Sequence, residues 1–238
     1  MTLLYVFPHP DDESFGPAPG IAQEVREGHA VHVLTLTRGG ATKERHRLGL
    51  SVEEMGDVRR HEMDGVARAL GLDTLAVLDF PDGGMAALDP RTIEAAVRER
   101  IEAVRPDVLV TYAVHGNSVH PDHLVTHAVV KRVFCEMRAA GGPRRLALFT
   151  LVNGEMEGAA AHLRGTAPEE IGAKIHYTPE DRARAEAALA CYVTYADVVA
   201  AHDPLGLMDR YGISFILFDE PRPEPALERL TDALPAAA

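Results

Sequence analysis

The sequence predicts an α/β fold with a mostly parallel sheet flanked by helices. Short runs of β-branched and other apolar residues alternate with longer segments whose apolar residues recur at helical spacing, which is typical of βαβ units. The chain has 238 residues, of which 46% are hydrophobic and 25% charged. This is enough for one large α/β domain with a full core. We therefore expect a single domain over residues 1–220 and a C-terminal tail over residues 221–238.

The expected elements follow from this alternation along the chain. Short apolar runs predict six strands, at residues 3–7, 29–37, 74–80, 107–112, 145–152 and 213–218. Helical periodicity predicts four helices between them, at residues 20–27, 53–70, 90–104 and 122–140. Gly28, Gly71 and Gly141 each follow a predicted helix, where left-handed C-caps usually stand. The tail from Glu220 is rich in Pro and Ala and predicts a loop with a short helix.

Charge and cysteine content limit the partners and the compartment. A formal net charge of −12 argues against nucleic acid as a partner, since such binding depends on clustered Lys and Arg. We expect no membrane span and no export signal, because long apolar runs and a basic N-terminal segment are both missing. Cys135 and Cys191 lie in apolar helical patterns and are expected to be small buried side chains, which fits a reducing cytoplasm.

Polar residues follow four of the predicted strands. They occupy residues 9–13, 38–42, 81–84 and 115–123. Ligands of open parallel sheets bind beyond the carboxyl ends of the strands, so these four segments are expected to face one crevice.

Two of these segments are rich in metal ligands. His9 and Asp12 stand three residues apart in HPDDE, so an imidazole and a carboxylate can converge on one ion if the chain turns. The segment HGNSVHPDHLVTH supplies a second cluster, consisting of His115, His120, Asp122, His123 and His127. Such a ligand set suits zinc, and a catalytic zinc keeps three protein ligands and one open position. The spacing alone leaves open whether Asp11 or Asp12 is the carboxylate ligand.

Helix capping is the alternative explanation for HPDDE. Acids after a strand often accept hydrogen bonds from free backbone N–H groups of the next helix. Two clusters at separate strand ends favour the metal site, because buried charged groups are costly without a partner.

HPDDE together with HPDH resembles the LmbE-like (PIG-L) family of zinc-dependent N-acetylglucosaminyl deacetylases, over about the first 140 residues. The resemblance implies a Rossmann-like three-layer sandwich, a Zn²⁺ cofactor, for which iron or cobalt would also suit the ligands, and a homo-oligomer. It implies that His9, Asp12 and His123 bind the metal. The implied reaction removes the acetyl group of a small N-acetylglucosamine-type substrate, such as a glucosaminyl conjugate in thiol-cofactor biosynthesis, and releases acetate.

The same resemblance implies three catalytic residues. Asp11 would be the general base, a role for a carboxylate that lies beside the metal without binding it. His120 would act as an acid or stabilise the oxyanion. Asp122 would orient His120, and a carboxylate partner of this kind keeps an imidazole charged at neutral pH.

The resemblance also implies two substrate contacts, Arg59 and Asp82. Arg59 and Glu62 match an Arg-x-x-Glu of the family, in which the arginine contacts the substrate; the alternative is an exposed ion pair between them. Asp82 in FPDGG matches an Asp-Gly of the family, and the alternative is a plain turn.

One position departs from the family pattern. The family commonly has Thr-x-Gly-Glu after the second strand, and Gly40 stands here at the place of the Glu. Three neighbouring charged residues are candidates to take its place, namely Lys43, Glu44 and Arg45.

Two other functions remain open at this point. An amidase that cleaves thiol-sugar conjugates would use the same motifs. A non-catalytic module that binds sugar or metal would need neither Asp11 nor His120.

Overall fold

The computed structural model describes residues 1–153 and 161–235. Its strands form one seven-stranded sheet of order β3-β2-β1-β4-β5-β7-β6. The first five strands in this order are parallel, and β7 pairs antiparallel with both β5 and β6. The strands are β1 (Thr2–Phe7), β2 (Ala30–Thr37), β3 (Thr74–Phe80), β4 (Val108–Tyr112), β5 (Arg145–Thr150), β6 (Ala173–Ile175) and β7 (Ile213–Leu217). The predicted α/β class and mostly parallel sheet are confirmed.

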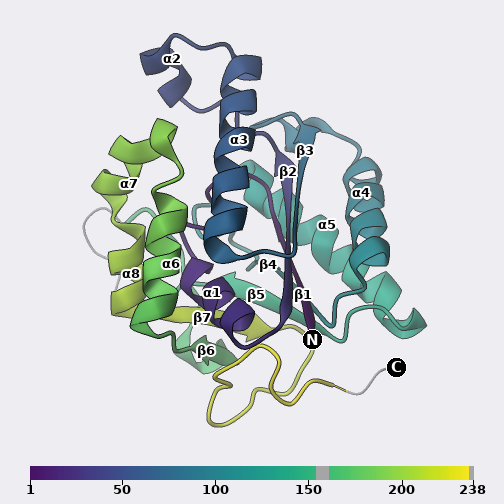
Figure 1. Ribbon diagram of the computed structural model, residues 1–238. Coiled ribbons are helices and arrows are strands. Elements are labelled where there is room, and N and C mark those ends of the chain that lie inside the picture. Colours follow the sequence, from purple (N-terminus) through teal and green to yellow (C-terminus); the bar gives the residue numbers. More distant parts are fainter. Residues whose placement is uncertain (154–160, 236–238) are drawn as a thin grey trace.

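Helices cover both faces of this sheet, which makes three layers (Figure 1). The α-helices are α1 (Ala18–Arg26), α2 (Glu44–Leu48), α3 (Val52–Leu70), α4 (Pro90–Val104), α5 (Pro121–Met137), α6 (Pro179–Leu189), α7 (Ala196–His202) and α8 (Pro204–Tyr211). Helices α4 and α5 lie on one face, and α1, α3 and α6 lie on the other.

Strand β1 lies at the centre of both cores. Leu3, Tyr5 and Phe7 pack into the core under α1, α3 and α6, whereas Leu4 and Val6 pack into the core under α4 and α5. A strand that is buried on both faces needs an uninterrupted apolar run, which is why LLYVF does not alternate with polar residues. This run carries the chain through the centre of the sheet and delivers HPDDE at its carboxyl end.

The C-terminal third contains elements that the sequence did not predict. Helices α6, α7 and α8 and strand β6 all fall between the fifth and the last predicted strands. The short helix predicted after Glu220 is wrong, because the described part of the tail, residues 221–235, holds no helix. Instead, the carbonyl groups of Leu230 and Asp232 accept hydrogen bonds from the buried guanidinium of Arg145, which also pairs with Glu220.

The two cysteines are free, but they are not both buried. Cys135 is exposed and Cys191 is half-buried. The prediction of two buried side chains is therefore wrong; Cys135 lies on the solvent side of α5, where helical periodicity in an apolar stretch does not guarantee burial. Within residues 1–153 and 161–235, none of the helices is long and apolar enough to cross a membrane.

Candidate metal centre

A cavity of about 550 Å³ opens where the strand order reverses. β1 pairs with β2 on one side and with β4 on the other, so the segments that follow β1 and β4 leave the sheet at the point where open α/β sheets bind ligands. All four polar segments contribute to its lining, with His9, Asp11, Asp12, Ala41, Thr42, Asp82, Gly83, Asn117, Ser118, His120 and His123. The expectation that these segments face one crevice is confirmed.

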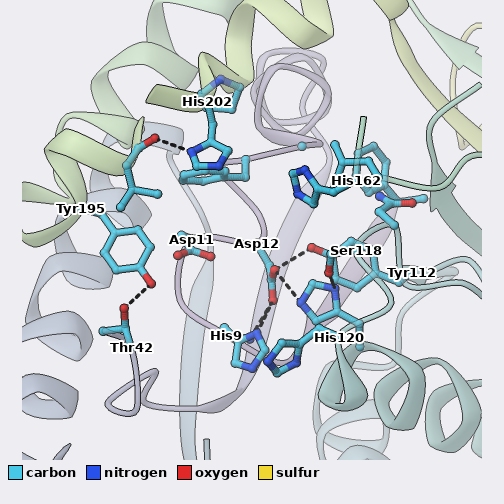
Figure 2. A pocket seen from close by; sticks show the side chains of 18 of the residues that line it. His9, Asp11, Asp12, Thr42, Tyr112, Ser118, His120, His162, Tyr195 and His202 are labelled. Atoms are coloured by element: carbon cyan, nitrogen blue, oxygen red, sulfur yellow. Dashed lines mark hydrogen bonds and ion pairs between the residues drawn. The ribbon is translucent and has the colours of Figure 1, made fainter. Parts of the chain in front are cut away.

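The structure brings the three predicted metal ligands together in this cavity. The Oδ1 atom of Asp12 lies 3.4 Å from Nε2 of His123, and its Oδ2 atom lies 3.5 Å from Nδ1 of His9. His120 joins the cluster, since ligand nitrogens of the three histidines all lie within 4.8 Å of one another. Figure 2 places Asp12 in the middle of the cavity, with His9 and His120 together on one side of it.

The surroundings of His123 leave its Nε2 atom free to bind a metal through its lone pair. Nδ1 lies 2.8 Å from the carbonyl oxygen of Gly116, which can only accept, so the proton is on Nδ1. Burial lowers the pKa of His123, which keeps the imidazole neutral at neutral pH, so Nε2 carries a lone pair and faces the Asp12 carboxylate. A backbone carbonyl that fixes the tautomer in this way is typical of metal-binding histidines. Two electron-rich atoms at 3.4 Å repel unless a cation lies between them, so the donor set fits a divalent metal.

Tyr112 holds two of these groups in place. It is the last residue of β4; its hydroxyl donates to Oδ1 of Asp12 at 2.6 Å, and its ring stacks on that of His123 with centroids 4.4 Å apart. Sequence reasoning missed this residue. The available signal was an aromatic side chain at the carboxyl end of the strand that precedes the histidine cluster.

The carboxylate of Asp122 does not pair with His120 as expected. It accepts hydrogen bonds from the backbone N–H groups of Gly83 and Met85, at 2.7 and 3.1 Å, and lies 3.2 Å from Nε2 of His9. His120 is instead oriented by the backbone N–H of Asp122, which donates to its Nδ1 atom at 3.2 Å. A carboxylate partner was expected to raise the pKa of His120. The pKa is lowered instead, mainly because of burial. His120 thus directs a neutral Nε2–H toward the cavity.

Asp11 lies beside the cluster in a strained backbone conformation. Its φ of 93° is in the left-handed region, which a residue with a side chain rarely adopts. Its N–H donates to the hydroxyl of Tyr192 at 2.8 Å, and that hydroxyl donates to Glu13 at 2.7 Å. Burial raises the pKa of Asp11 to about 6, and the positive charge of Arg59 opposes this rise.

Arg59 and Glu62 bind different partners. The guanidinium of Arg59 is 2% exposed, donates to Oδ2 of Asp11 at 2.6 Å and lies over the ring of Tyr195. Glu62 accepts from the backbone N–H and the hydroxyl of Thr194, at 2.7 and 2.8 Å. The alternative of an exposed ion pair is therefore wrong. Arg59 also lines the cavity, and its contact with a substrate stays a prediction.

The backbone around Gly40 does not accommodate the glutamate that the family commonly has at this position. A Cβ atom at Gly40 would come within 2.1 Å of the carbonyl oxygen of Val52, so the backbone of α3 leaves no room for a glutamate. Asp82 supplies a carboxylate nearby: its Oδ2 accepts from the N–H of Ala41 at 2.7 Å, and its Oδ1 lies 3.3 Å from Nε2 of His9. The three charged candidates for the place of the Glu are Lys43, Glu44 and Arg45. None of them is among the described residues that line the cavity.

We predict that Tyr192→Phe lowers both stability and turnover. The change leaves the buried N–H of Asp11 and the Glu13 carboxyl without their shared partner, which should cost roughly 1–3 kcal/mol in the free energy of unfolding. Turnover should fall because Asp11 is freer to leave its strained conformation. Urea unfolding and initial rates measure the two effects. Tyr195→Phe is the control, because its hydroxyl bonds Thr42 and not the HPDDE segment; equal losses in both variants would contradict the prediction.

Comparisons with known proteins find a matching family model and similar curated proteins. A family model described as "PIG-L: GlcNAc-PI de-N-acetylase" matches residues 4–134, which is more than half of the chain. A 1D-myo-inositol 2-acetamido-2-deoxy-alpha-D-glucopyranoside deacetylase from Kineococcus radiotolerans is 31% identical over 170 residues, covering 60% of this chain and 46% of the relative. A mycothiol S-conjugate amidase from Streptomyces coelicolor is 34% identical over 152 residues, covering 56% of this chain and 52% of the relative. The chain spans about half the length of these relatives.

A solved structure extends the likeness of the fold to the C-terminal third. The zinc-inhibited form of teicoplanin deacetylase Orf2 superposes with a TM-score of 0.71 at 18% sequence identity, covering 93% of this chain and 100% of the other. At this identity the likeness concerns the fold.

Proposed function

This chain belongs to the PIG-L family, and we propose that it is a metal-dependent hydrolase that removes the acetyl group from a small N-acetylglucosamine-type substrate and releases acetate. One observation carries the proposal. The HPDDE and HPDH segments meet in a single cavity, where Asp12 lies between His9 and His123 while Asp11 turns to Arg59.

We propose that His9, Asp12 and His123 hold the metal, with zinc as the expected ion. When bound, a divalent metal supplies a Lewis acid that polarises the amide carbonyl and makes a nearby water more acidic. The tautomer of His123 and the hydroxyl of Tyr112 support this ligand set, because each fixes a donor atom in place before an ion arrives.

The chain's own residues then move the protons and steady the developing charge. Asp11 accepts a proton from the water whose oxygen attacks the acetyl carbon. The Nε2–H of His120 donates a hydrogen bond to the carbonyl oxygen as negative charge gathers on it. Asp11 passes its proton to the nitrogen as the C–N bond breaks, so the products are acetate and the free amine. Asp122 acts on His120 through its backbone N–H and holds His9 through its carboxylate.

We propose Asp82 and Arg59 as groups that face the sugar. The Asp82 carboxylate lines the cavity next to His9, where it can accept hydrogen bonds from sugar hydroxyls. The guanidinium of Arg59 already bonds Asp11, so its main effect is to hold the base in position.

An acetate-release assay tests the proposal. Metal-loaded protein should release acetate from members of a panel of N-acetylated sugars, and the metal content should be measured on the same preparation. Binding of N-acetylglucosamine without acetate from any panel member would favour the non-catalytic binding module. The cytoplasmic location and the homo-oligomer stay predictions.

An amidase acting on thiol-sugar conjugates is the second candidate. The relative named as a mycothiol S-conjugate amidase supports it, and the same residues would cleave a larger amide. Adding a cysteinyl glucosaminyl conjugate to the panel separates the two, since the amidase would release the cysteinyl part as its free carboxylic acid, together with the sugar amine, instead of acetate.

A further inference from the structure

The cavity that holds the metal cluster is also lined by a wall of apolar side chains. We call this wall the apolar end; it consists of Leu151, Leu163, Val198, Pro204, Leu207 and Met208. None of these residues belongs to the motifs after the first four strands. The proposed chemistry uses none of them.

Two short helices supply most of the apolar end. Pro204, Leu207 and Met208 stand at positions i, i+3 and i+4 of α8, so they lie on one face of that helix. Val198 comes from α7, and Leu151 follows β5. Met208 and Pro204 are buried, whereas Val198 and Leu207 are partly exposed. The apolar end thus combines buried side chains, which are held in place by packing, with partly exposed side chains that a ligand can contact.

The apolar end and the metal cluster belong to the same cavity. Figure 2 shows His162 and His202 at the end opposite to His9 and His120, with Asp11 and Asp12 between them. Both His162 and His202 are exposed, so this end opens to solvent. A ligand held at the cluster can therefore extend along the apolar wall toward the surface.

The size and charge of the cavity restrict what extends there. Its volume of about 550 Å³ lies within the range of roughly 300–1,000 Å³ that is typical of pockets for drug-sized ligands, and a single sugar ring is smaller than such ligands. Arg59 is the only Lys or Arg among the described residues of the lining, and its guanidinium is paired with Asp11. An anionic group such as a phosphate would lack a cation here, whereas an apolar group would displace water from the wall.

We infer that the apolar end binds an alkyl or aryl group attached to the amino sugar, so that the preferred substrate is an apolar glycoside of N-acetylglucosamine. This inference rests on the proposed function, which places the acetamido group at the cluster. The acetamido-bearing carbon C2 is bonded to the anomeric carbon, so the glycosidic substituent leaves the sugar beside the reacting group. It is the part of the substrate that reaches the apolar end.

A matched pair of glycosides tests the inference. The kcat/KM for acetate release is compared between methyl and n-hexyl N-acetyl-β-glucosaminide, and the dissociation constants are measured by calorimetry. Each buried methylene contributes about 0.8 kcal/mol, a factor of roughly four. Since the wall covers the chain on one side, we expect the hexyl glycoside to be favoured by about 10- to 100-fold in both measurements.

Variants of the wall locate the preference. Leu207→Asn keeps the number and branching of the side-chain heavy atoms and makes the side chain polar, so the hexyl-to-methyl ratio should fall by about tenfold. Leu48→Asn is the matched control on α2, where Leu48 is exposed and lies outside the cavity lining, and its ratio should equal that of the unmodified protein. Val198→Thr, a change of equal volume, provides the same test should Leu207→Asn fail to fold.

The two proposals fail in different ways. Absence of acetate from every glycoside would overturn the deacetylase proposal, while the ratio of dissociation constants would still decide on the apolar end. Equal values for the two glycosides, or a hexyl preference that survives both wall variants, would overturn the inference.

Discussion

Replacing Asp11 by asparagine is expected to slow acetate release by roughly 10²- to 10⁴-fold, the usual contribution of a general base, while the metal stays bound. The amide of asparagine can still accept a hydrogen bond from Arg59, so the HPDDE segment keeps its shape. It cannot accept a proton from water. Steady-state rates on the best substrate of the panel, together with metal analysis of the same protein, measure both parts of this prediction.

Asp12→Asn is the matched comparison for this variant. Asp12 lies next to Asp11 in the chain but faces His9 and His123, so its loss should reduce the metal content as well as the rate. Thermal unfolding of both variants checks that the fold persists, because Asp11→Asn leaves the buried charge of Arg59 with a weaker partner. Normal turnover in Asp11→Asn would remove Asp11 from the mechanism, and metal loss in Asp11→Asn alone would exchange the roles of the two aspartates.

Local patterns were sufficient to predict six of the seven strands and the position of the cavity. The apolar run of β1 and the β-branched segments that follow it each report burial of a strand, which depends on neighbouring residues in the chain. The parallel arrangement then places HPDDE and HPDH at the same edge of the sheet. For this reason the sequence could place His9, Asp12 and His123 in one cavity without knowledge of their contacts.

The direction of a polar side chain could not be predicted in the same way. The carboxylate of Asp122 has two possible neighbours, the imidazole of His120 and the free N–H groups of the loop after β3. The backbone N–H groups of Gly83 and Met85 in this loop donate to the carboxylate, because buried backbone donors are costly when unpaired. That choice depends on how the β3 loop packs against α5, and no pattern within HPDH records it.

The C-terminal third could not be predicted because its role depends on long-range contacts. Tyr192 bonds Asp11 across 181 positions of the chain, and Thr194 bonds Glu62 across 132. α6 is rich in Ala and charged residues, so the apolar stripe that marks a helix is weak there. The residues that shape the apolar end of the cavity lie in this same region, so the motifs that indicate the chemistry carry no information on the preferred glycoside.

A second large effect is expected from His123→Gln, which should lose both metal and activity. Removing a residue that merely supports a metal ligand costs roughly 10- to 100-fold in metal affinity, so losing a direct ligand should cost more than about 100-fold. The variant keeps the helix, because glutamine is a good helix former. Titration with Zn²⁺ followed by calorimetry measures the affinity, and acetate release measures the activity.

His127→Gln is the control for this variant, one turn further along α5. The two histidines are similarly buried, at 8% and 6% exposure, and each has an Nδ1 atom bonded to a backbone carbonyl. They differ in what Nε2 meets, since His123 faces the Asp12 carboxylate and His127 does not line the cavity. Metal affinity should therefore fall in His123→Gln and remain near its original value in His127→Gln. Equal affinity in both variants would mean that the HPDH segment does not ligate the metal through His123, and His120 would then be the ligand to test.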